Sequence, residues 1–95
     1  MRIKVQNLRS SNNNPVPNQF LIYQNDNIYF QSYYSTIAKI DSKGGLILDS
    51  NRWDYSRTTL KYLYNFIEQF KGFRPNKKSL TELIESKEIK TINLN

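Results

Sequence analysis

Apolar and polar residues alternate along the first half of the chain with a period of two, which predicts β-strands. In residues 2–8, for example, Ile3 and Val5 share one face of the predicted strand, while Lys4 and Gln6 share the other. The same alternation predicts further strands at residues 19–23, 28–33, 36–40 and 46–48. We therefore expect residues 1–50 to be mainly β.

Polar segments rich in turn-forming residues separate these strands. Residues 10–18 are rich in asparagine and contain Pro15 and Pro17, so we expect a loop there. Residues 24–27 read Gln-Asn-Asp-Asn, and such residues accept the left-handed conformations of a tight hairpin turn. Residues 41–45 end in two glycines and predict a second hairpin.

The hydrophobic period changes to that of a helix in the second half of the chain. One apolar face is formed by Leu60, Leu63, Tyr64, Ile67 and Phe70. The pattern predicts a long helix over residues 54–71, with Asp54 or Ser56 as its N-cap and Gly72 as its C-terminal left-handed residue.

A second, short helix is expected over residues 79–87, where Ser79 and Glu82 have the spacing of a capping box. Residues 89–94 alternate again and predict a C-terminal strand that returns to the sheet. The chain, residues 1–95, is thus expected to be a single α+β domain. Its antiparallel sheet of about five to six strands, with two hairpins, would pack against the long helix and the short one.

The charge balance is basic: 14 lysines and arginines against 8 acidic residues, a net charge of +6. Such a balance favours nucleic acid, an acidic protein surface or anionic lipid as a partner. An AT-rich genome, which enriches Lys, Ile and Asn, explains the same composition without a functional cause. Cysteine is absent and no stretch resembles a signal peptide or a membrane span, so we expect a cytoplasmic protein with no membrane partner.

Histidine and cysteine are both missing, which removes the usual zinc sites and the common nucleophile–base pairs. Asp41, Asp49 and Asp54 offer oxygen ligands of the kind that magnesium prefers. Each of them lies at a predicted turn or helix start, however, where aspartate has a structural role. We therefore expect no catalytic residue, no metal and no cofactor, with a carboxylate- or tyrosine-based hydrolase as the remaining enzymatic alternative.

An aromatic strand and a basic loop are the main candidates for a binding surface. Alternation places Tyr29, Gln31 and Tyr33 on one face of their strand, opposite Phe30. We expect the helix to cover the tyrosine face, with the hydroxyls at its rim. The alternative is an exposed face on which bases stack.

The basic cluster surrounds Phe73 between the two helices, and either contacts a nucleic-acid backbone or merely solvates a loop. The full set of candidate binding residues is Tyr29, Tyr33, Arg52, Arg57, Lys61, Lys71, Phe73, Arg74, Lys77 and Lys78.

The segment WDYSRTT at residues 53–59 marks the junction between the predicted sheet and the long helix. We expect Trp53 to anchor this corner in the core, Tyr55 to pack beside it, and Asp54 or Ser56 to cap the helix. Arg52 and Arg57 are then the residues free to contact a partner.

Several longer motifs resemble an uncharacterised family of short proteins from bacteriophages and other mobile elements. They are NPVPNQF at residues 14–20, YFQSY at 29–33, STIAK at 35–39, Leu48-Asp49 followed by WDYSRTT, Lys61-Tyr62, and a terminal NLN at 93–95. The likeness covers nearly the whole chain, with departures between residues 63 and 76. It implies a phage or mobile-element origin and brings no established activity.

Together these observations predict a small, non-enzymatic accessory protein that binds DNA or RNA through a basic surface. The alternative is a protein-interaction module that inhibits or redirects a host factor, such as an anti-defence inhibitor. Its partner would then be a host or phage protein, and a homodimer is a further option.

Overall fold

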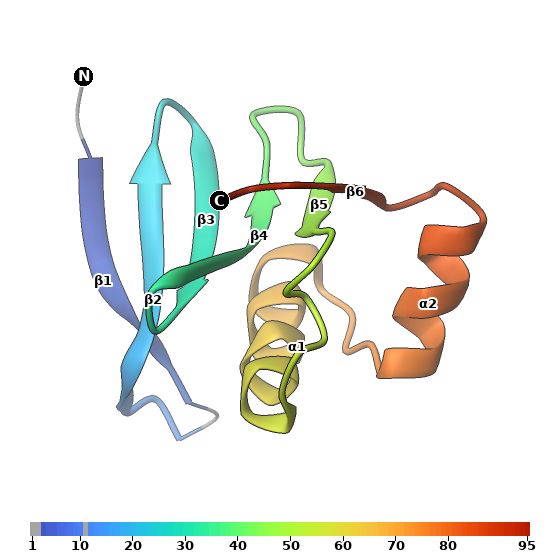
Figure 1. The fold of residues 1–95 in the computed structure, drawn as a ribbon. Coiled ribbons are helices and arrows are strands. Elements are labelled where there is room, and N and C mark those ends of the chain that lie inside the picture. The colour runs from blue at the N-terminus through green and yellow to red at the C-terminus, as the bar shows by residue number, and fades with distance from the viewer. Residues whose placement is uncertain (1–2, 11) are drawn as a thin grey trace.

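The computed structural model describes residues 3–10 and 12–95, which form a six-stranded sheet and two helices (Figure 1). The strands are β1 (Ile3–Arg9), β2 (Pro15–Gln24), β3 (Asn27–Ser32), β4 (Ser35–Ile40), β5 (Leu46–Asp49) and β6 (Lys90–Ile92). The helices are α1 (Arg57–Lys71) and α2 (Lys77–Glu85). The predicted α+β class is confirmed. Arg2, the expected first residue of the first strand, lies outside the described residues.

The strands follow one another in the sheet in the order in which they occur in the chain. Neighbouring strands from β1 to β5 are antiparallel, as expected, but β6 pairs parallel to β5. Both helices lie between β5 and β6 in the sequence, and such a crossover can return the chain to the end of the sheet at which β5 began. The C-terminal strand prediction is therefore right in position, and the parallel pairing comes from the helical connection.

The two predicted hairpin turns have the backbone geometry that their residues favour. Asn25 and Asp26 both have positive φ, 52° and 66°, as the mirror-image turns of tight hairpins require. Gly44 has a φ of 84° in the second hairpin. There the Asp41 carboxylate accepts hydrogen bonds from the backbone N–H groups of Gly45 at 2.8 Å and Lys43 at 3.0 Å.

The expected loop over residues 10–18 is shorter than predicted, because β2 already begins at Pro15. Pro15 pairs with Arg9 of β1, and the register between these strands shifts between Asn7 and Arg9. Proline lacks the N–H of a ladder bond and is tolerated at the first residue of a strand or beside a bulge, where no ladder bond is lost. Pro15 is therefore the first residue of β2, and the two prolines do not exclude a strand here.

Helix α1 begins at Arg57, three residues later than predicted, because Ser56 and not Asp54 is its N-cap. The Ser56 hydroxyl accepts a hydrogen bond from the backbone N–H of Thr59 at 3.0 Å. At the other end Gly72 has a φ of 80°, and its N–H donates to the carbonyl of Glu68 at 3.1 Å, as the sequence predicted.

Helix α2 also begins elsewhere than expected, and the Ser79–Glu82 capping box is wrong. Asn76 is the N-cap: its side-chain oxygen accepts from the N–H of Ser79 at 2.8 Å. The Ser79 hydroxyl accepts in turn from the N–H of Asn76 at 2.9 Å. Asparagine caps as well as serine does, so the helix starts at the earlier of the two competent residues and Ser79 becomes its third residue.

The core lies between the sheet and α1. The fully buried rings of Phe30 on β3 and Phe66 on α1 stack with their centroids 5.6 Å apart. Tyr23 on β2 adds an edge contact to Phe70 at 6.5 Å. Helix α1 therefore covers the face of β3 that carries Phe30, and the expectation that it covers the Tyr29 face is wrong. A buried tyrosine needs a hydrogen-bond partner for its hydroxyl, whereas Phe30 has no polar group and can be buried without one.

We predict that Phe66→Ala lowers the free energy of unfolding by about 3–5 kcal/mol, because it removes a fully buried ring and leaves a cavity. Urea denaturation followed by circular dichroism measures the change. Phe66→Leu should give a smaller loss and remain folded if the alanine variant does not. Tyr34→Ala, at a ring that is 97% exposed, should change stability by no more than about 0.5 kcal/mol. Equal losses for Phe66→Ala and Tyr34→Ala would contradict this assignment of the core.

Candidate binding surface on the open face of the sheet

The WDYSRTT segment forms a structural corner between β5 and α1. Trp53 is buried in the core cluster, and its backbone N–H donates to the carbonyl of Asp49 at 3.2 Å. Ser56 caps the helix, as one of the two options predicted. Tyr55 does not pack as expected: it is 51% exposed in the loop before the cap. The corner therefore depends on the tryptophan and the serine.

Asp49 connects this corner to the end of the chain. Its carboxylate is fully buried and accepts hydrogen bonds from the N–H of Leu94 at 2.7 Å, the N–H of Asn51 at 3.1 Å and the Asn95 amide at 3.1 Å. Burial raises the pKa of this carboxyl, but the bonds from Leu94, Asn51 and Asn95 outweigh burial and hold its pKa below 3.8. Asp49 therefore fixes the terminal NLN segment, and its role in the fold is structural.

The basic residues of the α1–α2 region point in different directions. Lys71 donates to the carbonyl of Gly44 in the β4–β5 turn. Arg74 turns back to α1, where it donates to the Asn65 side chain at 2.6 Å and lies 3.7 Å from the Glu68 carboxylate. The structure therefore does not gather the predicted loop cluster into one patch.

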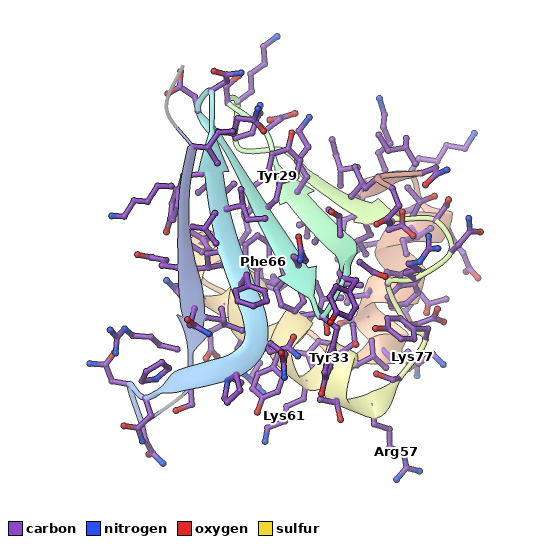
Figure 2. The ribbon with its side chains drawn as sticks, turned by 60° about the vertical axis from the view of Figure 1, so that its left-hand side comes forward. Tyr29, Tyr33, Arg57, Lys61, Phe66 and Lys77 are labelled. Atoms are coloured by element: carbon purple, nitrogen blue, oxygen red, sulfur yellow. The ribbon has the colours of Figure 1, made fainter. Side chains whose placement is uncertain are left out.

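Lys77 points in a third direction, toward Asp54 of the corner, with 3.8 Å between the ammonium and the carboxylate. This pair is solvent-exposed, so it contributes little to stability. Lys61 lies over the ring of its neighbour Tyr62 at 5.3 Å from the centroid. Figure 2 shows Arg57, Lys61 and Lys77 at separate points along the rim of the molecule.

The remaining candidates of the helical layer are also scattered. Arg57 and Lys78 are exposed, and Arg52 is half-buried. Phe73 lines a surface hollow of about 550 Å³ beside α2, whose lining includes the carboxylates of Glu82 and Glu88. The same lining includes the Arg74 guanidinium, so the hollow carries charges of both signs and is not a basic patch for a nucleic-acid backbone.

The face of the sheet opposite α1, which we call the open face, brings different residues together. Side chains on the covered face belong to the core, among them Leu21, Phe30, Ala38 and Leu48. Alternation directs their neighbours outward. One row is in register across all the strands and consists of Val5, Ile22, Tyr29, Lys39, Ile47 and Lys90. The apolar members of this row lie outside the core cluster.

The centre of the open face combines an aromatic ring with a cation. Tyr29 and Lys39 are directly paired on β3 and β4, and the Lys39 ammonium lies 5.6 Å from the Tyr29 ring centroid. Phe20 and Gln31 form the neighbouring pair on β2 and β3. Rings, amides and lysines therefore alternate on one continuous surface.

Negative charge is nearly absent from this surface. Among the described strands the single carboxylate is that of Asp49, which is buried and fully engaged. The four glutamates all belong to the segment from 68 to 88, in the helical layer. The strands of the open face therefore carry lysines and no exposed carboxylate, while the Asp41 carboxylate of the β4–β5 turn interacts electrostatically with Lys39.

One end of the open face carries two further aromatic rings. Tyr33 and Tyr34 form the turn between β3 and β4, and they are 48% and 97% exposed. Of these residues, Tyr29 and Tyr33 were candidates predicted from the sequence, whereas Tyr34, Phe20, Lys39 and Lys90 were not. Strand alternation was the signal for Phe20 and Lys39, and Tyr34 was recognisable as an aromatic in a place where turn formers are usual.

The family model of DUF8033, described as a family of unknown function, matches residues 3–82. The chain belongs to this family. No curated protein and no solved structure matches the chain. The family match extends from β1 into α2, so it includes most of the open face and the Tyr33–Tyr34 turn but not β6.

The described residues offer neither a metal site nor a membrane-spanning helix. No three acidic side chains there are grouped closely enough to hold a metal ion, and histidine and cysteine are absent from the sequence. Within the same residues, neither helix combines the length and apolarity needed to cross a bilayer.

We predict that Asp49→Asn lowers the free energy of unfolding by about 1.5–3 kcal/mol at pH 7, because an ionised acceptor of three hydrogen bonds is lost. The folded-state pKa of Asp49 lies below the unfolded value of 3.8. The contribution of its charge to the free energy of unfolding is therefore complete above pH 3.8 and declines as the pH falls through the folded-state pKa. Urea titrations of both proteins from pH 7 to pH 2.5 should show their difference narrowing below about pH 3.8. A difference that is independent of pH would contradict the role assigned to the charge.

Proposed function

We propose that this protein is a small, non-enzymatic accessory protein that binds single-stranded nucleic acid on the open face of its sheet. The observation that carries the proposal is the row centred on Tyr29 and Lys39, which joins an aromatic ring to a cation on a face whose only strand carboxylate is buried. Stacking on aromatic rings and contact of lysines with phosphates are the two interactions that hold single strands.

Charge complementarity favours an anionic partner on this face over a second copy of the chain. Two open faces packed together would bring Lys39 and Lys90 of both copies into one interface, to which the described strands contribute no exposed carboxylate. A phosphate backbone offers the missing charge. Tyr29 and Phe20 contribute stacking only to unpaired bases, so a single strand fits the surface better than a duplex does.

The basic residues of the helical layer are secondary in this proposal. Lys71, Arg74 and Lys77 each have an internal partner and lie apart from one another. Their contribution to nucleic-acid binding would be a general attraction from the net charge of +6. This shifts the binding surface from the loop that the sequence favoured to the sheet.

The setting of this activity follows from the sequence. The absence of histidine and cysteine supports binding instead of catalysis, and a chain without cysteine suits the reducing cytoplasm of a host cell. The motifs at residues 14–20, 29–33, 35–39 and 53–59 support a bacteriophage or mobile-element origin.

The alternative is a protein-interaction module, and the edge strand β1 favours it. Ile3 and Val5 are 58% and 57% exposed there, on a strand that pairs on one side with β2. Its free edge offers backbone groups to an extended segment of a partner protein, such as a host factor. In that case Val5→Lys should prevent capture of the partner from a host lysate, whereas the added cation on the open face should strengthen oligonucleotide binding.

We predict that the protein binds fluorescently labelled single-stranded DNA and RNA more tightly than it binds DNA and RNA duplexes of the same length. Anisotropy titrations at low salt measure these affinities. The double variant Lys39→Ala, Lys90→Ala should reduce the slope of log K against log salt concentration by about 1.4, since each phosphate contact on a single strand contributes about 0.7. The fold of this variant is checked by circular dichroism.

A matched control removes two positive charges from the helical layer, Lys77→Ala with Lys78→Ala, and should leave the slope unchanged. If the Lys77→Ala, Lys78→Ala variant reduced the slope and the Lys39→Ala, Lys90→Ala variant did not, the contact would lie on the α1–α2 loop. Failure of all four nucleic-acid probes to bind would exclude the proposed function and leave the protein-interaction alternative.

A further inference from the structure

Strands β3 and β4 are joined by a two-residue turn whose residues are both tyrosines. Ser32 pairs with Ser35 across the base of the turn, so Tyr33 and Tyr34 make up the whole connection. Tyr33 has a φ of 55°, in the left-handed region that bulky side chains rarely adopt. Figure 2 shows Tyr33 at the end of the sheet remote from Tyr29.

The other hairpin turns of the same sheet use ordinary turn formers at the corresponding positions. Asn25 and Asp26 have positive φ between β2 and β3, and Gly44 has positive φ between β4 and β5. Glycine and asparagine adopt this conformation at low cost, whereas tyrosine does so under strain. The identity of the residues at 33 and 34 is therefore not explained by the geometry of the turn.

The strained backbone of Tyr33 is held from both sides. Its N–H donates to the carbonyl of Asn18 at 2.7 Å, and its own carbonyl accepts from the Gln31 side-chain amide at 2.7 Å. A strained conformation persists where its surroundings over-determine it, and such conformations cluster at functional sites. These two hydrogen bonds hold the turn in one conformation.

The rings of Tyr33 and Tyr34 do not contribute to the hydrophobic core. Tyr34 is 97% exposed, Tyr33 is 48% exposed, and neither belongs to the core cluster. Their neighbours on β3, β4 and the turn include no carboxylate. Gln31, whose amide donates to the Tyr33 carbonyl, and its partner Phe20 lie between the turn and the Tyr29 row, so the turn adjoins the open face.

We propose that the Tyr33–Tyr34 turn is a preorganised stacking platform for an unpaired base of single-stranded nucleic acid. This inference rests on the proposed function and assigns the base contact to one segment. A stacked base exchanges water for a ring face, and a turn that is already rigid loses little conformational freedom when the base binds. The folded protein already bears the energetic cost of the left-handed tyrosine, so the base meets a turn that is fixed before it binds.

The first experiment compares a fluorescein-labelled 20-mer of deoxythymidine with an abasic 20-mer, which has the same phosphates and no bases. We expect the wild-type protein to prefer the thymidine strand about 5- to 100-fold, as stacking of one or two bases predicts. Tyr34→Ala should reduce this preference while its affinity for the abasic strand stays unchanged. Phe73→Ala, at a half-exposed aromatic in the helical layer, is the matched control and should keep the full preference.

The outcomes separate this inference from the proposed function. If wild-type protein binds neither strand, both fail. If it binds the two strands equally, or if Tyr34→Ala keeps the full preference, the function stands and the stacking platform is excluded.

A second experiment tests the strain itself through Tyr33→Asn and Tyr33→Gly, which suit a positive φ. Both variants should have a melting temperature equal to or above that of the wild type, together with a reduced preference for the thymidine strand. A clear fall in melting temperature would show that the Tyr33 ring serves the fold, and would overturn the inference.

Discussion

The packing of α1 against one face of the sheet, through the stacked rings of Phe30 and Phe66, is the contact on which the rest of the structure depends. Helix α1 has one apolar stripe and therefore covers one sheet face. A chain of 95 residues with α1 on one side of its sheet forms two layers there. The opposite face of the sheet then stays in contact with solvent, and its residues become available to a partner.

This division into layers also separates the charges. The glutamates belong to the helical layer, where Glu68 and its neighbours offset the lysines and arginines of α1 and α2. Lys39 lies on the open face beside the Tyr29 ring, and the Asp41 carboxylate of the adjoining turn interacts with it electrostatically. The net charge of +6 is thus less informative than its distribution. The helical layer has both cations and acids, whereas the described strands of the sheet carry lysines and a single, buried carboxylate.

The two ends of the helical segment are fastened to the sheet by polar contacts. Trp53 and Ser56 set the entry into α1, while Asp49 holds the residues that follow β6. Asn95 accepts from the N–H of Thr36 and donates to its carbonyl, which extends the hydrogen bonding to β4. The parallel return of β6 beside β5 is therefore supported by hydrogen bonds from the residues after β6 to both β5 and β4.

The sequence by itself determined the elements of this fold and left their relation to one another open. Hydrophobic period located the strands and α1, and local chemistry located the hairpin turns at Asn25 and Gly44 and the helix end at Gly72. These features depend on neighbouring residues, so sequence rules reach them. The N-cap of α2 was misassigned because Asn76 and Ser79 are equally competent and lie one turn apart.

The tertiary structure alone decided which face of β3 the helix covers and where the basic side chains point. Both faces of β3 carry aromatic residues, so the alternating pattern of the sequence does not show which face is buried. The choice depends on the fit of Phe30 against Phe66, a contact between residues 36 positions apart in the sequence. Likewise, Lys71, Arg74 and Lys77 are close in sequence, but their partners come from the β4–β5 turn, α1 and the β5–α1 corner. A binding surface assembled across strands is a property of their register, which no single segment contains.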